Sequence, residues 1–455
     1  MFVGRQRELD LLRQRVKGNT FEFGLVYGRR RIGKTTLLKK LIEQTPGIYF
    51  VASEMDLAYN IRKLSQTVTG HFGDRFVFST LEDIFAYLQD KSRQRRVLLI
   101  IDEFTYLFSK EPGVQSVLQG IIDDLVSYDI ALVLSGSQVG MIEDVISYRK
   151  PLYGRTTFKI KLEPFDYYDS ARFYPGYPVE DKIRTYAVFG GIPYVLSKID
   201  ERLSLAENII RLIVDKDGIL GEETEFFLKR ELRATSTYGM IIHAIAGGAT
   251  RLSEISDKSL VHNTGTTSKY IKTLMDLGIV RKDICFSERE SSRKTLYRIS
   301  DHFFDFHDRF IHSNRSKQAL MSSGAFYDTV IKPELDQYVS RVYEDVCKEY
   351  LIRKSRRQPV GQITEIARYW ANHTGLKREI EIDLATKDSM GVTVYECKWT
   401  NRPFDASDAK NLINESTVLS PYRHGGFSKS GFTDEALRHL DIALTPESLF
   451  DPLLA

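Results

Sequence analysis

The sequence feature that most constrains the fold is a glycine- and arginine-rich stretch at residues 28–36, which reads G-R-R-R-I-G-K-T-T. A short apolar run at residues 23–27 precedes it, and apolar residues at helical spacing follow it from Leu37 to Ile42. The sequence therefore predicts a buried strand, a glycine loop and a helix in direct succession. In that arrangement, backbone N–H groups and a helix N-terminus point toward one place, where they can bind a polyphosphate.

The stretch matches G-x-x-x-x-G-K-[ST], the phosphate-binding loop of P-loop NTPases. Two glycines permit the tight wrap of the loop. Lys34 is expected to reach the terminal phosphates of ATP, and the Thr35 hydroxyl is expected to ligate Mg²⁺. The residues predicted to contact the nucleotide are Gly28, Arg29, Arg30, Arg31, Ile32, Gly33, Lys34, Thr35 and Thr36.

Two acidic residues, Asp102 and Glu103, end a second apolar run at residues 97–101. A continuous apolar run is typical of a strand in a parallel sheet that is covered on both faces. Ligands bind at the carboxyl ends of the strands in such sheets. We therefore expect Asp102 to hold Mg²⁺ through water and Glu103 to polarise the attacking water.

Two further segments have both a nucleotide-binding and a structural interpretation. The opening F-V-G-R-x-x-E-L-x-x-L resembles that of AAA+ and STAND ATPases, which implies that Val3, Gly4 and Arg5 lie by the adenine. The alternative is an N-terminal helix that contacts no ligand. Ser137 follows a third apolar strand, at the "sensor 1" position beside the γ-phosphate in those proteins. The alternative is a turn that satisfies the backbone groups at the strand end.

Arg155 and Pro193 also have two interpretations each. Arg155 in P-L-Y-G-R looks like the arginine that caps the sheet in related ATPases, where it would neutralise developing phosphate charge. The alternative is a surface ion pair. Pro193 in G-G-I-P-Y resembles the G-x-P element of STAND helical subdomains, whose proline lies against the nucleotide base. The alternative is a simple helix break.

In this order, Y-G-R-R-R-I-G-K-T, L-L-I-I-D-E-F, L-S-G-S, P-L-Y-G-R and G-G-I-P-Y resemble the archaeal-type ATPase family of the STAND class. The resemblance covers roughly the first half of the chain. It implies a P-loop ATPase domain at residues 1–168, a helical subdomain at residues 169–232, and a nucleotide-controlled switch that turns over slowly. The chain is also a candidate for self-association when ATP binds.

Residues 233–312 change to three short helical segments and a basic hairpin, an order that resembles a winged helix. Its outward polar face would suit the major groove of DNA. The alternative is an internal packing domain whose basic residues form a solvated face. The basic residues of the predicted hairpin are Arg281, Lys282, Arg289, Arg293, Lys294 and Arg298.

A polar segment at residues 313–328 is a predicted linker, and a last domain follows at residues 329–455. Asp383 lies in a stretch that alternates with period two, and Glu396 and Lys398 lie in the next such stretch. Because this period predicts half-buried strands, the three side chains are expected to meet on one face of a hairpin.

The pattern of Asp383, Glu396 and Lys398 resembles the D…E-x-K constellation of restriction-endonuclease-like, PD-(D/E)xK nucleases, although no literal Pro-Asp pair precedes the first strand. Two carboxylates there bind Mg²⁺ beside a scissile phosphate, and the lysine orients or activates water. Glu344, on the preceding helix, looks like the additional acid of many members. The alternative is a domain that keeps the fold and binds without cleaving.

Composition limits the classes of function and partner that remain for this chain. The formal net charge of +3 over 455 residues is too small to prove a polyanionic partner, so any DNA-binding surface must be local. Three cysteines lie far apart without C-x-x-C spacing, which argues against disulfides and a zinc site. There is no signal-peptide pattern and no apolar run near the ~18 residues of a membrane span. We expect a cytoplasmic protein without membrane contact.

The sequence therefore predicts an α/β protein: a P-loop NTPase with a parallel sheet and a helical subdomain, then a winged helix and an α/β restriction-endonuclease-like domain. The functional hypothesis is an ATP-hydrolysing switch that licenses metal-dependent DNA cleavage. The alternative is a DNA-binding or signalling ATPase whose C-terminal domain is a non-cleaving binding module.

Overall fold

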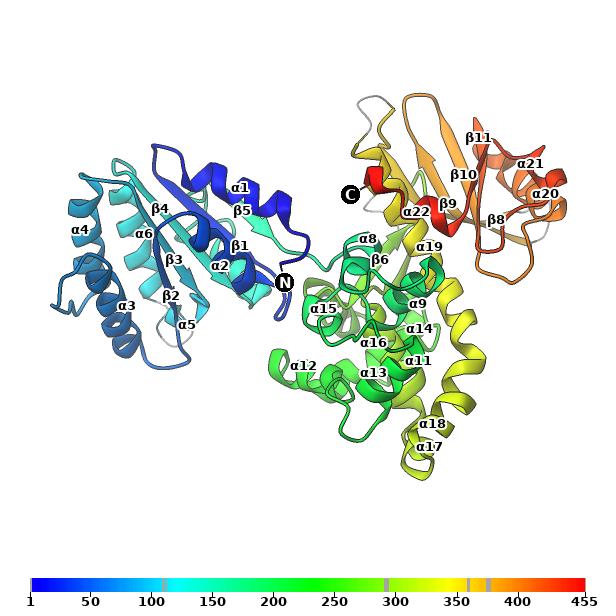
Figure 1. Ribbon diagram of the computed structural model, residues 1–455, viewed down its shortest axis with the longest axis horizontal. Coiled ribbons are helices and arrows are strands. Elements are labelled where there is room, and N and C mark those ends of the chain that lie inside the picture. Colours follow the sequence, from blue (N-terminus) through cyan, green and yellow to red (C-terminus); the bar gives the residue numbers. More distant parts are fainter. Residues whose placement is uncertain are drawn as a thin grey trace. The chain divides into compact units, whose positions relative to one another are not determined.

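The computed structural model describes residues 2–108, 111, 113–289, 294–357, 361–373 and 378–454. Arg293 of the predicted basic hairpin lies outside the described residues. The chain forms two compact units, residues 1–164 and 165–455 (Figure 1). Each unit has its own sheet and its own buried hydrophobic clusters.

The first unit is built on a five-stranded parallel sheet with the strand order β2-β3-β4-β1-β5. Its strands are β1 (Glu22–Tyr27), β2 (Ile48–Val51), β3 (Val97–Asp102), β4 (Ile130–Gly136) and β5 (Phe158–Lys161). Its helices are α1 (Gln6–Val16), α2 (Lys34–Gln44), α3 (Leu57–His71), α4 (Leu81–Ser92), α5 (Thr105–Phe108), α6 (Val114–Leu125) and α7 (Val139–Val145).

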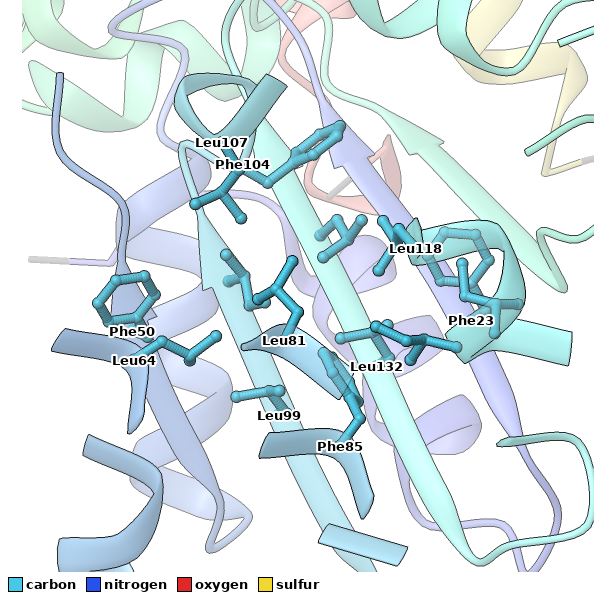
Figure 2. Close-up of a cluster of buried hydrophobic side chains, with 14 of the residues drawn as sticks. Phe23, Phe50, Leu64, Leu81, Phe85, Leu99, Phe104, Leu107, Leu118 and Leu132 are labelled. Carbon is cyan, nitrogen blue, oxygen red and sulfur yellow. The ribbon is translucent and has the colours of Figure 1, made fainter. Parts of the chain in front are cut away.

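The core of the first unit lies between this sheet and its helices (Figure 2). Phe23 of β1, Leu99 of β3 and Leu132 of β4 are fully buried. They belong to one cluster with Phe85 of α4 and Leu118 of α6. Every residue of β1, β3 and β4 is buried, as the apolar runs predict for parallel strands covered on both faces. Because these strands are parallel, their carboxyl ends meet at one edge of the sheet.

The second unit begins with short helices, continues into three helices and a hairpin, and ends in a mixed sheet (Figure 1). The first helices are α8 (Tyr167–Ser170), η1 (Ala171–Phe173), α9 (Val179–Phe189), α10 (Pro193–Leu196), α11 (Leu205–Ile209), η2 (Ile210–Val214) and α12 (Glu223–Glu231). The next elements are α13 (Thr235–Ala246), α14 (Leu252–Lys258), α15 (Thr264–Asp276) and the antiparallel strands β6 (Val280–Ile284) and β7 (Thr295–Ile299). Further helices are α16 (His302–Phe306), η3 (His307–Ile311), η4 (His312–Asn314), α17 (Arg315–Leu320), α18 (Ser323–Phe326), η5 (Tyr327–Ile331) and α19 (Lys332–Ser355).

The second sheet has the order β12-β11-β10-β9-β8. Neighbours among β8, β9 and β10 are antiparallel, whereas β11 is parallel to β10, and β12 is parallel to β11. Its strands are β8 (Glu365–His373), β9 (Arg378–Lys387), β10 (Val392–Lys398), β11 (Arg423–Ser428) and β12 (Ile442–Leu444). The remaining helices are α20 (Ala406–Ser416), η6 (Thr417–Leu419), α21 (Asp434–Leu437), α22 (Pro446–Leu449) and η7 (Pro452–Leu454). Both α19 and α20 pack on β9 and β10, so helices cover the strands that carry the predicted acids.

The β6–β7 hairpin is joined to this second sheet. Just after β6, the backbone N–H of Phe286 donates to the carbonyl of Arg368 in the edge strand β8, at 2.8 Å. The Cys285 thiol contacts the Trp370 carbonyl at 3.4 Å. The Phe286 ring is fully buried in one cluster with Ile382 and Val394 of β9 and β10. The hairpin therefore packs against the edge strand β8 of the second sheet.

The predicted α/β class and parallel sheet of the nucleotide domain are confirmed. The first unit ends at residue 164 rather than 168, and the later predicted domains lie together in one compact unit. Residues 313–328, predicted to be a linker, instead form short helices. A local contact and a tertiary contact stabilise these helices. The Ser322 side chain caps α18, and Gln318 donates to the carbonyl of Val214, about a hundred residues earlier in the chain, at 2.9 Å.

Candidate functional site

The phosphate-binding loop connects β1 to α2 in a conformation that requires glycine. Gly28 has φ +151°, and a Cβ there would lie 2.5 Å from the carbonyl oxygen of Leu162. Gly33, which precedes α2, has φ +94°. Both values lie where L-residues are strained, so the two glycines of the motif are needed for backbone reasons. The buried Lys34 ammonium donates to the carbonyls of Gly28 and Arg29, at 2.8 and 3.1 Å, inside the loop.

The first turn of α2 is linked to the end of β3. The Thr35 hydroxyl donates to Asp102 Oδ2 at 2.8 Å, and the Tyr49 hydroxyl donates to the same oxygen at 2.7 Å. Asp102 is 1% exposed. Burial, together with the hydrogen bond to Asp102, raises the pKa of Tyr49. A hydroxyl and a carboxylate are hard oxygen ligands of the kind that Mg²⁺ prefers, so Thr35 and Asp102 fit the ion.

Tyr49 is a site residue that the sequence patterns did not reveal. It lies in β2, whose pairing with β3 places Tyr49 opposite Ile100. No motif marks it, because its role depends on which strand lies beside β3.

Glu103 and Ser137 lie at the carboxyl ends of the adjacent strands β3 and β4. The Ser137 hydroxyl donates to Glu103 Oε2 at 2.9 Å, and Ser137 is 1% exposed. Glu103 itself has φ +53°, a left-handed conformation that costs about 1–2 kcal/mol for a residue with a Cβ. Ser137 therefore lies at the edge formed by the carboxyl ends of the strands, and its hydroxyl holds the carboxylate of Glu103, which is predicted to polarise water.

The opening segment of the chain lies against the loop. Arg5 donates to the carbonyl of Ile32 at 3.4 Å and to the carbonyl of Glu163. Its left-handed backbone, φ +60°, follows that of Gly4 at φ +62° and precedes α1. The structure thus brings Arg5 to the loop, and contact of Val3, Gly4 and Arg5 with adenine stays a prediction.

Arg155 does not lie at this edge. Its guanidinium forms a two-bond ion pair with Asp123 of α6, at 2.7 and 2.9 Å, and donates to the carbonyl of Pro151. It lines a cavity with Thr20 and Phe21, which precede β1 and so mark the opposite edge of the sheet. Of the two interpretations, the structure supports the surface ion pair within this chain. Pro193 belongs to the second unit, where it is the first residue of α10.

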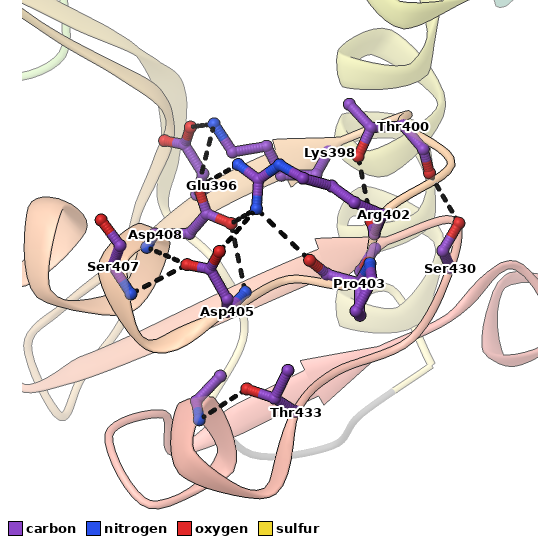
Figure 3. Close-up of polar contacts among 12 residues, drawn as sticks. Glu396, Lys398, Thr400, Arg402, Pro403, Asp405, Ser407, Asp408, Ser430 and Thr433 are labelled. Carbon is purple, nitrogen blue, oxygen red and sulfur yellow. Dashed lines mark hydrogen bonds and ion pairs between the residues drawn. The ribbon is translucent and has the colours of Figure 1, made fainter.

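Of the predicted acids and lysine of the C-terminal domain, Glu396 and Lys398 lie together on β10 (Figure 3), and Asp383 reaches them from β9. Lys398 Nζ lies 2.5 Å from Glu396 Oε1 and 3.9 Å from Asp408 at the start of α20. Asp383 Oδ2 accepts the backbone N–H of Cys397, at 2.8 Å, between those two residues. Sequence patterns did not reveal Asp408, whose carboxylate also forms an ion pair with Arg402 at 2.8 Å.

Glu344 of α19 reaches the same region through Arg368 of β8. Arg368 pairs with Glu344 at 2.6 Å and with Glu381 of β9. Burial raises the pKa of Glu344 to about 8 and the pKa of Glu396 to about 7, and it also raises the pKa of Asp383. These carboxylates therefore share a poorly solvated place with too little positive charge to hold all of them ionised.

Within the described part of the chain, no group of three or more His, Cys, Asp and Glu side chains is arranged to hold a metal ion. Mg²⁺ commonly binds through one or two carboxylates and keeps several waters. Asp383 and Glu396 therefore fit an open Mg²⁺ site but not a closed protein cage.

Three of the described basic residues of the β6–β7 hairpin form ion pairs within the chain: Arg281, Lys294 and Arg298. Arg281 pairs with Asp345 of α19 at 2.7 Å and with Asp283 at 3.0 Å. Arg298 lies 3.5 Å from Asp283. These pairs favour the packing interpretation of the hairpin over a free DNA-binding wing.

Over the described ranges, the longest apolar helical stretches fall short of what crossing a bilayer would require.

Two protein families match parts of this chain, and the first match continues past the end of the first unit at residue 164. Residues 2–199 match a family described as an ATPase domain predominantly from Archaea. Residues 307–412 match a family described as "Archaea bacterial proteins of unknown function".

Two relatives come from Methanocaldococcus jannaschii. The uncharacterized protein MJECL04 is 32% identical over 402 residues, which is 88% of each chain. The uncharacterized ATP-binding protein MJ0423 is 46% identical over 43 residues, 10% of this chain and 73% of that protein. Among solved structures, the Walker-type ATPase PABY2304 of Pyrococcus abyssi is similar with a TM-score of 0.52 and 20% identity, over 68% of this chain and 96% of that one. At this identity the similarity supports the fold.

Proposed function

This chain belongs to the family of MJECL04 and matches an ATPase domain found predominantly in Archaea, and we propose that it is a Mg²⁺-dependent ATPase switch with a nuclease-like C-terminal domain. The observation that carries the ATPase proposal is the meeting of two strand ends with the phosphate-binding loop. Thr35 and Asp102 are 2.8 Å apart, and Ser137 orients Glu103 from the next strand.

Each residue has a distinct task in ATP hydrolysis. Lys34, which donates hydrogen bonds to two carbonyls of the loop, binds the terminal phosphates and offsets their charge. Bound Mg²⁺, for which Thr35 and Asp102 would be the holding residues, supplies charge neutralisation at the transferred phosphate. Glu103 accepts a hydrogen bond from Ser137 and turns its other oxygen to the attacking water, which it orients and polarises.

Two substitutions test this function. In Lys34→Ala, ATP binding should be lost while the fold is kept, because the side chain faces the phosphate site. In Glu103→Gln, ATP should bind normally and hydrolysis should stop. Nucleotide binding is measured by calorimetry and turnover by phosphate release. Normal turnover in Glu103→Gln would remove Glu103 as the group that polarises water.

For the C-terminal domain we propose Mg²⁺-dependent cleavage of DNA, licensed by ATP. Support comes from Asp383, Glu396 and Lys398, which lie on adjacent strands as the chemistry needs. Asp383 and Glu396 would hold the ion, and Lys398 would orient the attacking water. The competing function is a binding module that does not cleave. It is favoured by the engagement of Lys398 with Glu396 and Asp408, which leaves little of its charge for water or phosphate.

Nicking of supercoiled plasmid separates the two functions. Wild type is compared with Asp383→Asn, in Mg²⁺ or Mn²⁺, with and without ATP. Cleavage that disappears in Asp383→Asn supports the nuclease, and dependence on ATP supports the switch. Salt-sensitive DNA binding that survives Lys398→Ala, without cleavage by wild type, supports the binding module.

A further inference from the structure

A buried arginine lies among the acids of the C-terminal site. Arg368 lies where the pairing of β8 with β9 shifts register. Ala367 pairs with Ala385 and Tyr369 pairs with Ile382, so two residues along β8 face three residues along β9. Its guanidinium pairs with Glu344 at 2.6 Å and with Glu381, and its side chain is 13% exposed. A fixed positive charge is thus built into the acidic cluster.

Arg368, Glu344 and Asp383 line one cavity of about 280 Å³. Six carboxylate residues and four cationic residues line this cavity, which gives it a formal net charge of −2. Arg281, another of the four, is held by Asp345 and Asp283. A cavity with this balance attracts a cation, and the Glu344 carboxylate that a divalent cation would need there is already paired with Arg368.

The bulge that carries Arg368 is held from the hairpin side. The carbonyl of Arg368 accepts the backbone N–H of Phe286 at 2.8 Å. Phe286 is 1% exposed and belongs to the same cluster as Ile382 of β9. The backbone at Arg368 is therefore held in place by the hairpin, and the guanidinium starts from a fixed point beside Glu344.

We propose that Arg368 is a built-in counter-ion that competes with a divalent metal ion for the C-terminal acids, so that metal binding requires the guanidinium to leave Glu344. The inference rests on the proposed metal site at Asp383 and Glu396 and adds its regulation. Arg368 acts as a positioning residue here, since it would touch neither substrate nor the reacting atoms.

Mn²⁺ affinity tests the proposal without any activity readout. Calorimetry is done on the full chain without nucleotide, and every protein carries Asp102→Asn so that the phosphate-binding loop contributes no metal site. Removing a nearby positive charge should strengthen cation binding, so Arg368→Gln should bind Mn²⁺ about tenfold more tightly than its parent. The matched control is Arg438→Gln, which removes the same charge from the exposed end of α21 and should leave affinity unchanged.

The outcomes are distinct. Equal or weaker Mn²⁺ binding in Arg368→Gln, with binding abolished by Asp383→Asn, overturns the counter-ion and leaves the proposed metal site standing. Absence of Mn²⁺ binding in every variant removes the proposed metal site and the inference together. If Arg368→Gln fails to fold, Arg368→Met decides, because methionine keeps an unbranched side chain without the charge and should also tighten Mn²⁺ binding. Unchanged affinity in Arg368→Met would then overturn the proposal.

Discussion

The hydroxyl of Tyr49 donates a 2.7 Å hydrogen bond to Asp102 Oδ2, the same oxygen that accepts the hydroxyl of Thr35. The two donors come from different elements, β2 and α2, and they fix the carboxylate that ends β3. A group that orients a metal-binding carboxylate commonly affects metal affinity or activity by about 10–100-fold.

Tyr49→Phe should therefore raise the Mg²⁺ concentration needed for half-maximal ATP hydrolysis by about tenfold, while ATP binding changes little. Phosphate release measured across a Mg²⁺ series gives this value. Tyr87→Phe is the matched control, because Tyr87 also donates to a carboxylate, Asp74, but lies away from the phosphate-binding loop. An equal Mg²⁺ requirement in Tyr49→Phe and Tyr87→Phe would show that Tyr49 has no orienting role.

Ser137→Ala removes the hydrogen bond that orients Glu103. We expect kcat to fall about tenfold, less than the ~10²–10⁴-fold that a general base itself contributes, with little change in KM for ATP. Steady-state hydrolysis gives both constants. The control is Ser147→Ala, whose hydroxyl donates to the carbonyl of Asp144 instead. A rise in KM at constant kcat would assign Ser137 to nucleotide binding rather than to the catalytic step.

Gly28→Ala should damage both stability and nucleotide binding. The added Cβ would lie 2.5 Å from the carbonyl oxygen of Leu162, at a φ of +151°. Strain of this kind costs about 1–3 kcal/mol, and relief of it would distort the loop. Thermal unfolding and ATP titration measure the two effects. Gly140→Ala, whose Cβ meets no atom within 4 Å, should be nearly neutral. Equal behaviour of the two variants would contradict the need for glycine in the loop.

The sequence predicted the strand, glycine loop and helix at residues 22–44 well because their signals are local. The glycines, Lys34 and Thr35 lie in one continuous stretch, and Asp102 ends an apolar strand whose place in a parallel sheet follows from its burial pattern. Tyr49 escaped prediction because its contact with Asp102 depends on the strand order β2-β3, which no single segment encodes.

The ion pairs within each unit could not be predicted, for a related reason. Arg155 meets Asp123 from α6, and Arg281 meets Asp345 from a helix far along the chain. Arg155 was a candidate for phosphate through the resemblance of P-L-Y-G-R, and Arg281 was a candidate for DNA through its charge, whereas tertiary packing decides their partners. The role of Arg368 could not be predicted either, because it is a register shift between β8 and β9 that places this residue among the acids.

Glu349 of α19 should make the stability of the second unit depend on pH. Its carboxylate accepts the backbone N–H of Tyr167 at 2.9 Å and the hydroxyl of Tyr186 at 2.8 Å. Burial raises the pKa of Glu349 to about 8. Because the folded state then binds the proton more tightly than the unfolded state, this contribution is complete below about pH 4.3 and is lost as the pH rises toward 8.

The unfolding free energy should therefore fall by up to about 1.4 kcal/mol per pH unit between pH 5 and 8 through this group. Glu349→Gln should be about 1 kcal/mol less stable at pH 5, because the amide replaces one of two acceptors, and should lose that part of the pH dependence. Urea unfolding followed by tryptophan fluorescence reports on the second unit, since Trp370 and Trp399 both belong to it. Glu435→Gln, at an exposed position of α21, should keep the wild-type slope. Parallel curves for wild type and Glu349→Gln would show that Glu349 is ionised in the folded protein throughout this range.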